Sequence, residues 1–289
     1  MRISDKEVVS LELKANEVRQ EVIKMLVEAK SGHSAGPLGM ADIFTALYFY
    51  HLNHKPQHPD WDDRDRLVLS NGHICPVRYA AMALAGYFPL TELKTLRKIH
   101  SRLQGHPHRT SLPGLETTSG PLGEGLGQSV GIALAGKMDR KSYKTYCLTS
   151  DGEHEEGSIW EAVMSAGKYK LHNLIQIIDY NNIQIDGPVT KIMPLEPFKE
   201  KYVAFNWQVL EMPGNDMGEI IKTIEHARTL TEKPVLIIAH TTPGKGVEFM
   251  ENDYTWHGKA PSVEEGEKAL TQLRKQEESI KRKKEGMGN

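Results

Sequence analysis

Residues 146–153, Tyr-Cys-Leu-Thr-Ser-Asp-Gly-Glu, and residues 174–183, Leu-Ile-Gln-Ile-Ile-Asp-Tyr-Asn-Asn-Ile, decide the fold. Each is an apolar run that ends in polar turn residues, and a helical segment separates them, which is typical of a βαβ unit. The strands of such a unit are parallel, so both turns fall at the same carboxyl edge of the sheet. We therefore expect Asp151 and Asn181 to meet over one small site.

These turns have the composition of a metal and phosphate anchor. A carboxylate and an amide oxygen suit a hard cation such as Mg²⁺, which completes its shell with water and phosphate oxygens. Gly152 lets the backbone approach a phosphate closely, and the helix that begins near Gly157 points free N–H groups toward the same edge. Asp-Gly and Asn-Asn are also common turn formers, so an ordinary pair of turns remains an alternative reading of these residues.

Composition restricts the class of protein. The 289 residues, 39% of them hydrophobic, suffice for one large α/β domain. Lys and Arg total 36 against 38 Asp and Glu, so no global basic footprint for nucleic acid is present. The only cysteines, Cys75 and Cys147, suggest a reducing compartment. The first residues lack a signal-peptide core and no run reaches membrane-spanning length, so we expect a cytoplasmic protein without a membrane partner.

Alternating strand and helix patterns predict an α/β fold, a doubly wound and mostly parallel sheet flanked by helices. We expect helices near residues 4–30, 40–52, 76–85, 90–98, 129–138 and 216–230, and further strands at 66–70, 207–212 and 234–240. Residues 31–39, rich in Gly and Pro, should interrupt the helices. Residues 1–262 form this domain, and residues 263–289 a charged helical tail whose basic run at 281–284 we interpret as solvated.

Histidines recur in Gly-rich or strand-terminal turns. Those in such turns are His33, His73, His106 and His257. Turn residues lie at the surface or line clefts, so each is either solvated or directed into a site. His51, His54 and His58, in contrast, are interpreted as surface residues. Two further readings, a zinc or manganese cluster around His154 in residues 151–156 and a metal site at residues 106–108, are disfavoured, the first because adjacent turn residues cannot all face one ion.

A glycine-rich run covers residues 117–128, Thr-Thr-Ser-Gly-Pro-Leu-Gly-Glu-Gly-Leu-Gly-Gln. Its glycines permit close backbone approach to a flat ligand, although a tight turn under a closely packed helix would have the same composition. It follows no clear strand and lacks the spacing of a dinucleotide-binding fingerprint, and it is not a P-loop.

Together these motifs resemble those of transketolases, which are thiamine-diphosphate enzymes. In chain order they are Ser31-Gly32-His33 with Pro37-Leu38-Gly39-Met40, Leu69-Ser70-Asn71-Gly72-His73, Gly105-His106-Pro107, Gly120-Pro121-Leu122-Gly123, Asp151-Gly152 with Glu156-Gly157, Asn181 to Gly187, and Trp256-His257-Gly258. The resemblance covers roughly residues 10–262. Ser150 stands where the Gly-Asp-Gly motif of thiamine-diphosphate enzymes has its first glycine.

The resemblance implies a diphosphate-binding (PP) domain with a defined site. It implies that the Asp151 and Asn181 side chains and the main-chain carbonyl of Ile183 bind Mg²⁺, for which Ca²⁺ or Mn²⁺ could substitute. Thiamine diphosphate is then expected against His73, Gly120, Pro121, Leu122, Gly152, Glu153, Asn181 and His257. His33 and His257 would handle protons at substrate oxygens, His106 would bind the ketol hydroxyl, and His73 would lie between diphosphate and substrate. Glu156 resembles a family glutamate at the interface between protomers.

A full transketolase continues with a pyrimidine-binding domain and a C-terminal domain. The resemblance therefore implies the N-terminal subunit of a split transketolase, active only with a C-terminal subunit in an α2β2 heterotetramer, with a homodimer possible for the chain alone. Such an enzyme transfers a two-carbon ketol unit from a ketose or its phosphate to an aldose, as in pentose phosphate metabolism. Two alternatives remain: another thiamine-diphosphate enzyme, either deoxyxylulose-phosphate-synthase-like or the α subunit of a 2-oxoacid dehydrogenase, and a non-catalytic cofactor-binding subunit.

Overall fold

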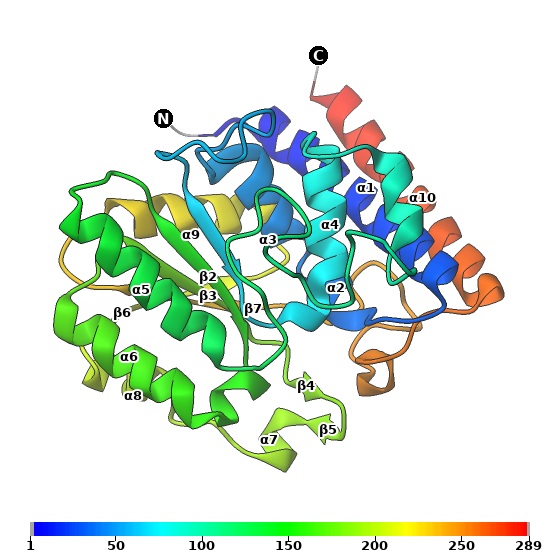
Figure 1. The fold of residues 1–289 in the computed structure, drawn as a ribbon. Helices are drawn as coiled ribbons and strands as arrows, with labels where there is room; N and C mark the ends of the chain where they lie inside the picture. Colours follow the sequence, from blue (N-terminus) through cyan, green and yellow to red (C-terminus); the bar gives the residue numbers. More distant parts are fainter. Residues whose placement is uncertain (1–2, 288–289) are drawn as a thin grey trace.

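A five-stranded parallel sheet forms the centre of the computed structural model, which describes residues 3–287 (Figure 1). Its strands, in spatial order, are β1 (Arg66–Leu69), β2 (Thr145–Ser150), β3 (Leu174–Asp179), β7 (Val235–His240) and β6 (Gln208–Pro213). After β3 the chain crosses to β6 at the far edge and then returns to β7 beside β3. The direction of winding therefore reverses, and the predicted doubly wound α/β fold is confirmed.

Helices cover both faces of the sheet, and successive residues of each strand serve two cores. On one face lie α5 (Glu124–Met138), α6 (Gly157–Tyr169) and α8 (Phe198–Ala204); on the other lie α1 (Asp5–Ala29), α3 (Ala41–Ala46), α4 (Cys75–Leu84) and α9 (Met217–Thr229) (Figure 1). Within β3, Ile175 and Ile177 join the second core, whereas Leu174 and Ile178 join the first. Burial on both faces explains why these strands read as continuous apolar runs.

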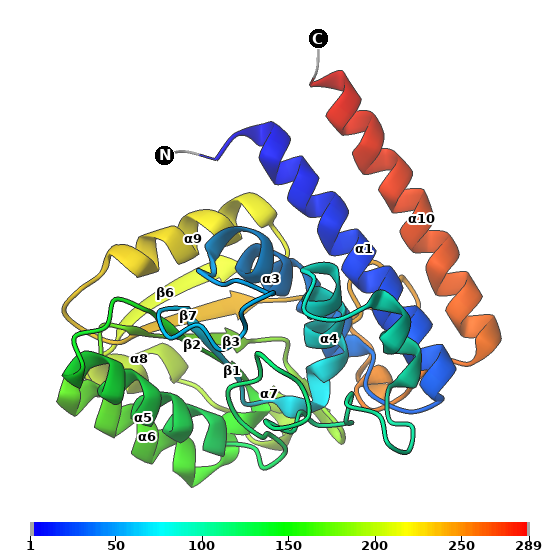
Figure 2. The same cartoon turned by 45° about the horizontal axis from the view of Figure 1, so that its top comes forward.

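The segment from residue 263 onward forms a long helix, α10 (Val263–Gly286), that lies along α1 (Figure 2). A capping box of Ser262 and Glu265 starts it, and its Leu270 and Leu273 are buried in the core that α1 shares. The Asn16 amide donates a hydrogen bond to the Leu273 carbonyl at 3.0 Å. The helix expected to be a tail is therefore packed on the domain, while Lys281, Arg282 and Lys283 in its basic run are exposed.

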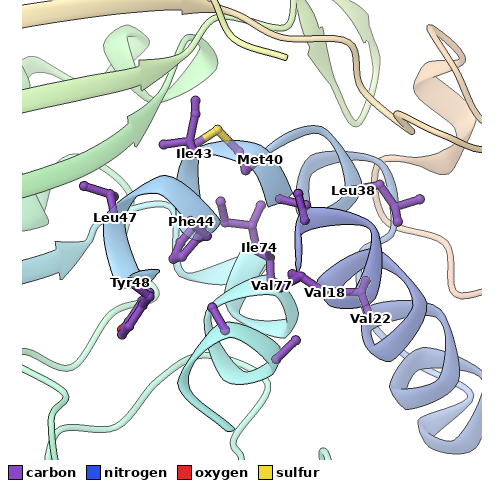
Figure 3. Packing of buried hydrophobic residues seen from close by; sticks show 14 of the residues in the cluster. Val18, Val22, Leu38, Met40, Ile43, Phe44, Leu47, Tyr48, Ile74 and Val77 are labelled. Carbon is purple, nitrogen blue, oxygen red and sulfur yellow. The ribbon is translucent and has the colours of Figure 1, made fainter. Parts of the chain in front are cut away.

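Buried side chains hold the loops that carry two of the histidines. Figure 3 shows Val18 and Val22 of α1 packed near Leu38, Phe44, Ile74 and Val77. Ile74 directly follows His73, and Leu38 belongs to the short helix α2 (Ala35–Gly39) that follows His33.

None of the helices between residues 3 and 287 combines the length and the hydropathy needed to cross a lipid bilayer.

Four local predictions need correction. The Gly- and Pro-rich run is helical from Ala35 to Gly39, because Pro37 falls in a first turn, where its missing N–H leaves no helical bond unmade. The helix expected at 40–52 is α3 followed by a π-helical turn, Leu47–His51, and the one expected at 90–98 is a 3₁₀ turn, Leu90–Thr95. His51 is buried rather than on the surface, because this π-turn packs on α9, whose Arg228 donates to the His51 carbonyl at 3.1 Å.

A buried ion pair joins α1 to the chain next to the site. The Arg19 guanidinium donates to both carboxylate oxygens of Asp42, and its Nε donates to the Leu38 carbonyl at 3.1 Å. Asn215 adds bonds of 2.8 Å to Asp42 and to the Gly39 carbonyl. Because both charges are buried and hydrogen-bonded to each other, removal of one partner leaves an uncompensated charge.

We expect Asp42→Ala to lower the free energy of unfolding by about 3–5 kcal/mol, the cost typical of leaving one buried charge unpaired. Urea denaturation followed by circular dichroism measures this difference. Glu17→Ala is the control, because it breaks a half-exposed pair with Lys14 and should cost no more than about 1 kcal/mol. Equal losses in the two variants would contradict the importance of the buried pair.

Candidate active site

A cavity of about 390 Å³ lies at the carboxyl ends of β2 and β3. It is lined by turns from distant parts of the chain. The predicted site residues that line it are His33, His73, His106, His257, Gly120, Leu122, Gly152, Glu153, Asn181 and Ile183. Pro121 is exposed and does not line it, and Asp151 lies behind the surface, 2% exposed. The structure thus brings together most of the side chains that the sequence singled out.

Three of the histidines form a compact cluster. The ring centroids of His33 and His73 lie 4.9 Å apart, those of His73 and His257 5.2 Å apart, and those of His33 and His257 5.5 Å apart. His33 comes from the loop between α1 and α2, His73 from the 3₁₀ turn Gly72–Ile74 after β1, and His257 from the residue after the 3₁₀ turn Tyr254–Trp256. His106 lies in the same cavity wall.

The environment of the cluster disfavours positive charge. Burial lowers the pKa of His33 to about 4, with further contributions from His257, Arg97 and His106. Burial likewise holds the pKa of His73 well below its usual value and lowers that of His257. The pKa of His106 is lowered by burial and then by the charge of Arg97. Near neutral pH these imidazoles are therefore uncharged and can both donate and accept protons.

The acidic edge of the cavity has the opposite character. The Asp151 carboxylate accepts N–H bonds from Gly152 at 2.8 Å and from Asn182 at 2.5 Å, so the two turns do meet as predicted. The Asn181 amide oxygen accepts from the Ile183 N–H at 2.9 Å, and its Nδ2 donates to Asp179 at 2.9 Å. Ile183 begins the small hairpin of β4 (Ile183–Gln184) and β5 (Gly187–Pro188), which precedes α7 (Val189–Ile192).

Asp179 is a site residue that the sequence interpretation missed. It is buried at the end of β3, lines the cavity, and accepts bonds from Asn181 and from the Thr241 hydroxyl. Its signal was an acidic residue closing an apolar strand, two positions before Asn181. Burial raises its pKa to about 7, and burial together with the Asp179 charge raises the pKa of Asp151 to about 7.

This arrangement fits a hard cation. Between residues 3 and 287 no salt bridge joins Asp151 or Asp179 to a basic side chain, so the two buried carboxyl groups lack a protein counter-charge. A carboxylate, an amide oxygen with a free lone pair and a main-chain carbonyl are ligands that Mg²⁺ accepts. Asp151, Asn181 and Ile183 would hold the ion, and Asp179 would orient the Asn181 amide.

The Glu153 side chain joins neighbouring turns of the site. Its carboxylate is turned inward, where it accepts the Gly123 N–H at 2.7 Å, the Ser150 N–H at 3.2 Å and the Ser70 hydroxyl. Glu153 lines the cavity, but these bonds hold its carboxylate within the protein. The side chain instead fixes the glycine-rich turn, where Gly120 has a φ of 154° and Gly123 a φ of 90°, against the end of β2.

The disfavoured metal readings gain no support. His154 is buried on the other side of its turn, where its ring nitrogens contact the Ser150 carbonyl at 2.7 Å and the Tyr202 hydroxyl at 2.8 Å. In the described part of the chain no three His, Cys, Asp or Glu side chains are grouped so as to hold a metal ion.

Comparison with known proteins identifies this architecture. The family model described as transketolase, thiamine diphosphate binding domain, matches residues 11–280. The chain belongs to the transketolase family. It is 40% identical over 280 residues to one subunit of the apulose-4-phosphate transketolase of Phocaeicola vulgatus, covering 97% of this chain and 99% of that protein. It is 39% identical over 268 residues to the 6-deoxy-6-sulfo-D-fructose transketolase subunit SqwG of a Clostridium species, covering 93% and 98%.

A solved structure shows the same fold within a longer chain. The transketolase of Campylobacter jejuni superposes with a TM-score of 0.87 at 38% identity, covering 96% of this chain but only 43% of that one. The predicted family and its thiamine-diphosphate-binding fold are thereby confirmed. Among transketolases this chain corresponds to those relatives that are separate subunits, because it spans nearly their whole length. The matches lend no support to the alternative thiamine-diphosphate enzymes.

We expect the His33 ring to stay neutral down to about pH 5 and to take up a proton near pH 4. The unfolded ring would titrate near its ordinary value of about 6.5, so its contribution to stability is present above that pH and is lost as the pH falls toward 4. Side-chain NMR of the ring carbons, assigned with His33→Gln, measures the titration. A midpoint near 6.5 would show that the ring is solvated.

Proposed function

We propose that this chain is the cofactor-binding subunit of a two-chain transketolase, which moves a two-carbon ketol unit from a ketose or ketose phosphate to an aldose with thiamine diphosphate and Mg²⁺. The observation that carries the proposal is its match to a separate transketolase subunit, 99% of whose length it covers, against 43% of a single-chain enzyme. The clustered histidines support catalysis over simple cofactor binding, because a diphosphate anchor alone would not require His33 and His106.

Each group at the acidic edge would have a separate task toward the cofactor. Asp151, Asn181 and the Ile183 carbonyl would hold the cation, with Ca²⁺ or Mn²⁺ as substitutes. The Gly152 backbone, where the nearest atom to an added Cβ would be 3.8 Å away, leaves room for a diphosphate. Leu122, in the cavity wall, would contact a ring by its side chain.

The histidines would manage protons and orientation. Thiamine diphosphate, when bound, supplies the electron sink for cleavage and formation of the C–C bond. His33 and His257, neutral near pH 7, would accept and return protons at the substrate oxygens, which requires groups with accessible lone pairs and N–H donors. His106 would hydrogen-bond the ketol hydroxyl, and His73 would lie between diphosphate and substrate.

A second polypeptide would complete the cavity. Leu122 and Ile185 both line it, yet their side chains are 38% and 71% exposed, and Ile192 and Met193 in the same projecting segment are also exposed. Apolar side chains around a cavity mouth indicate a surface that a partner covers. We propose that the pyrimidine-binding subunit binds here, in an α2β2 heterotetramer with Glu156 at the interface. Without that subunit, the chain would self-associate through the same surface. The assembly would be cytoplasmic.

The names of the relatives suggest candidate sugar substrates for this chain. One relative is named for apulose 4-phosphate and another for 6-deoxy-6-sulfo-D-fructose. Both are ketoses that carry an oxyanion, and D-xylulose 5-phosphate of pentose phosphate metabolism shares this feature. These three donors form the first substrate panel.

We expect Asp151→Ala to abolish Mg²⁺-dependent binding of thiamine diphosphate while the melting temperature changes by no more than about 4 °C. The Asp151 carboxylate is buried beside Asp179 without a counter-charge. Its removal relieves the repulsion between these two carboxylates, which limits the loss of stability. Calorimetric titration with and without Mg²⁺ measures the affinity. Glu161→Ala, an exposed acid of α6, is the control. Unchanged affinity in Asp151→Ala would refute the anchor.

We expect the purified chain alone, with cofactor and Mg²⁺, to consume none of the three ketoses, and activity to arise when the C-terminal subunit is added. The physical reason is the open cavity mouth, which leaves the reacting centre in water. A coupled assay for the aldehyde product measures turnover. Robust turnover by the chain alone would overturn the two-chain proposal.

A further inference from the structure

His154 lies behind the turn that carries Asp151, and its side chain is buried. It belongs to the 3₁₀ turn Gly152–Glu155, and its N–H donates to the Asp151 carbonyl at 2.8 Å. Its ring Nδ1 lies 2.7 Å from the carbonyl oxygen of Ser150, the last residue of β2. His154 therefore bonds Asp151 through its main chain and the residue before Asp151 through its side chain.

The hydrogen bonds of the imidazole fix its tautomer. A carbonyl oxygen only accepts, so the bond to Ser150 requires the proton on Nδ1. Nε2 is then the acceptor, and the two groups beside it can both donate: the Tyr202 hydroxyl at 2.8 Å and the Gln176 amide at 3.3 Å. The ring is therefore directional, with its donor toward β2 and its acceptor toward α8 and β3.

The partners of the imidazole are themselves held in place. The Tyr202 hydroxyl donates to the Gln176 amide oxygen at 3.0 Å, and the Gln176 amide nitrogen donates to the Thr149 hydroxyl at 3.0 Å. All three side chains are buried. A buried network in which each polar group has a partner specifies one arrangement, because another arrangement would leave a buried group unsatisfied.

Aromatic side chains close the space around the imidazole. Its ring centroid lies 5.0 Å from that of Phe198 in α8 and 5.9 Å from that of Trp160 in α6, both with the rings edge to face. The Trp160 indole N–H also donates to the His154 carbonyl at 3.0 Å. His154 thus joins the turn after β2 to two helices, so a movement of the turn would disturb their packing.

The same turn sets the direction of the Asp151 carboxylate. That carboxylate accepts the Gly152 N–H at 2.8 Å and the Asn182 N–H at 2.5 Å. Between residues 3 and 287 no salt bridge orients it. Its direction therefore depends on the conformation of the main chain on either side of Asp151, which is where His154 forms its bonds.

We propose that His154 is a positioning residue, whose ring and main chain hold the turn in the conformation that presents the Asp151 carboxylate to the cation. The inference rests on the proposed cation site and adds to it a residue that contacts neither the ion nor the cofactor. Buried groups that orient a metal ligand commonly contribute about 10- to 100-fold to metal affinity.

The test uses the purified full chain without a second subunit. Calorimetric titration with thiamine diphosphate, with and without Mg²⁺, compares the wild type with His154→Gln, His154→Asn and His154→Leu. Asparagine places its amide nitrogen near the position of Nδ1, glutamine places it near that of Nε2, and leucine has no donor. We expect Mg²⁺-dependent binding to weaken about 10- to 100-fold in His154→Gln and His154→Leu, and no more than about threefold in His154→Asn. Should His154→Leu fail to fold, the other two variants decide the result.

Asn173→Ala is the matched control for a loss of stability. It removes another buried bond, from the Asn173 amide to the Ala133 carbonyl at 2.8 Å, before the amino end of β3. We expect this variant to melt at a lower temperature than the wild type and to bind thiamine diphosphate with Mg²⁺ as the wild type does. Equal losses of affinity in Asn173→Ala and His154→Gln would reduce His154 to a general contribution to stability.

Amide hydrogen exchange of the chain without ligands provides a measurement that needs no cofactor. The N–H groups of Gly152 and Asn182 bond the Asp151 carboxylate, so their exchange reports the conformation of the turn. Their rates are divided by that of the Ile177 amide in the centre of β3, which corrects for changes in global stability. We expect this ratio to rise at least about tenfold in His154→Gln.

The two measurements separate the positioning role from the proposed function. If the wild-type chain binds no thiamine diphosphate with Mg²⁺ but the exchange ratio rises in His154→Gln and not in Asn173→Ala, the proposed function fails and the role of His154 in holding the turn stands. An exchange ratio in His154→Gln equal to that of the wild type would overturn the positioning role. Wild-type affinity for the cofactor in both His154→Gln and His154→Leu would overturn it as well.

Discussion

The parallel pairing of β2 with β3 is the constraint on which the candidate site depends. In this register Ser150 lies opposite Asp179, so the two strands end side by side and their following turns leave the sheet at one edge. The bond from the Asn182 N–H to Asp151 then closes the gap between those turns. A slip of one residue would exchange the side chains that face the two cores, so the packing of both helical layers holds the register and, through it, the site.

The two walls of the cavity have complementary electrostatics. On one wall, burial raises the pKa of Asp151 and Asp179 because no basic side chain of the described residues neutralises them; on the other, burial lowers the pKa of His33 and His73. Both effects arise from the same removal of water, which penalises whichever form is charged. A cation at the acidic wall would restore the ionised carboxylates, while the imidazoles would remain neutral. The protein therefore leaves the missing charge to its ligand.

The sequence predicted those features that depend on local pattern and chain order. Apolar runs located the strands, and the rule that parallel strands end at one edge placed Asp151 near Asn181. Features that depend on side-chain direction were not predictable in this way. Glu153 follows Gly152 directly, yet its carboxylate faces Ser70 and Gly123, which are distant in sequence. His51 resembles a surface residue by type and position, and only the packing of its π-turn on α9 buries it.

The same distinction separates the hydrophobic cores from the candidate site. Both faces of the sheet are covered by helices, and α10 lies along α1, so the hydrophobic cores are buried within the described chain. The cavity, in contrast, lies at the edge of the sheet, where the strands end in turns and no helical layer covers the turns. Ile185 remains 71% exposed there because the hairpin that carries it has no layer above it. A division of a longer enzyme between two chains at this edge would cut through the site and leave each hydrophobic core intact, which is the division that costs the least folding stability.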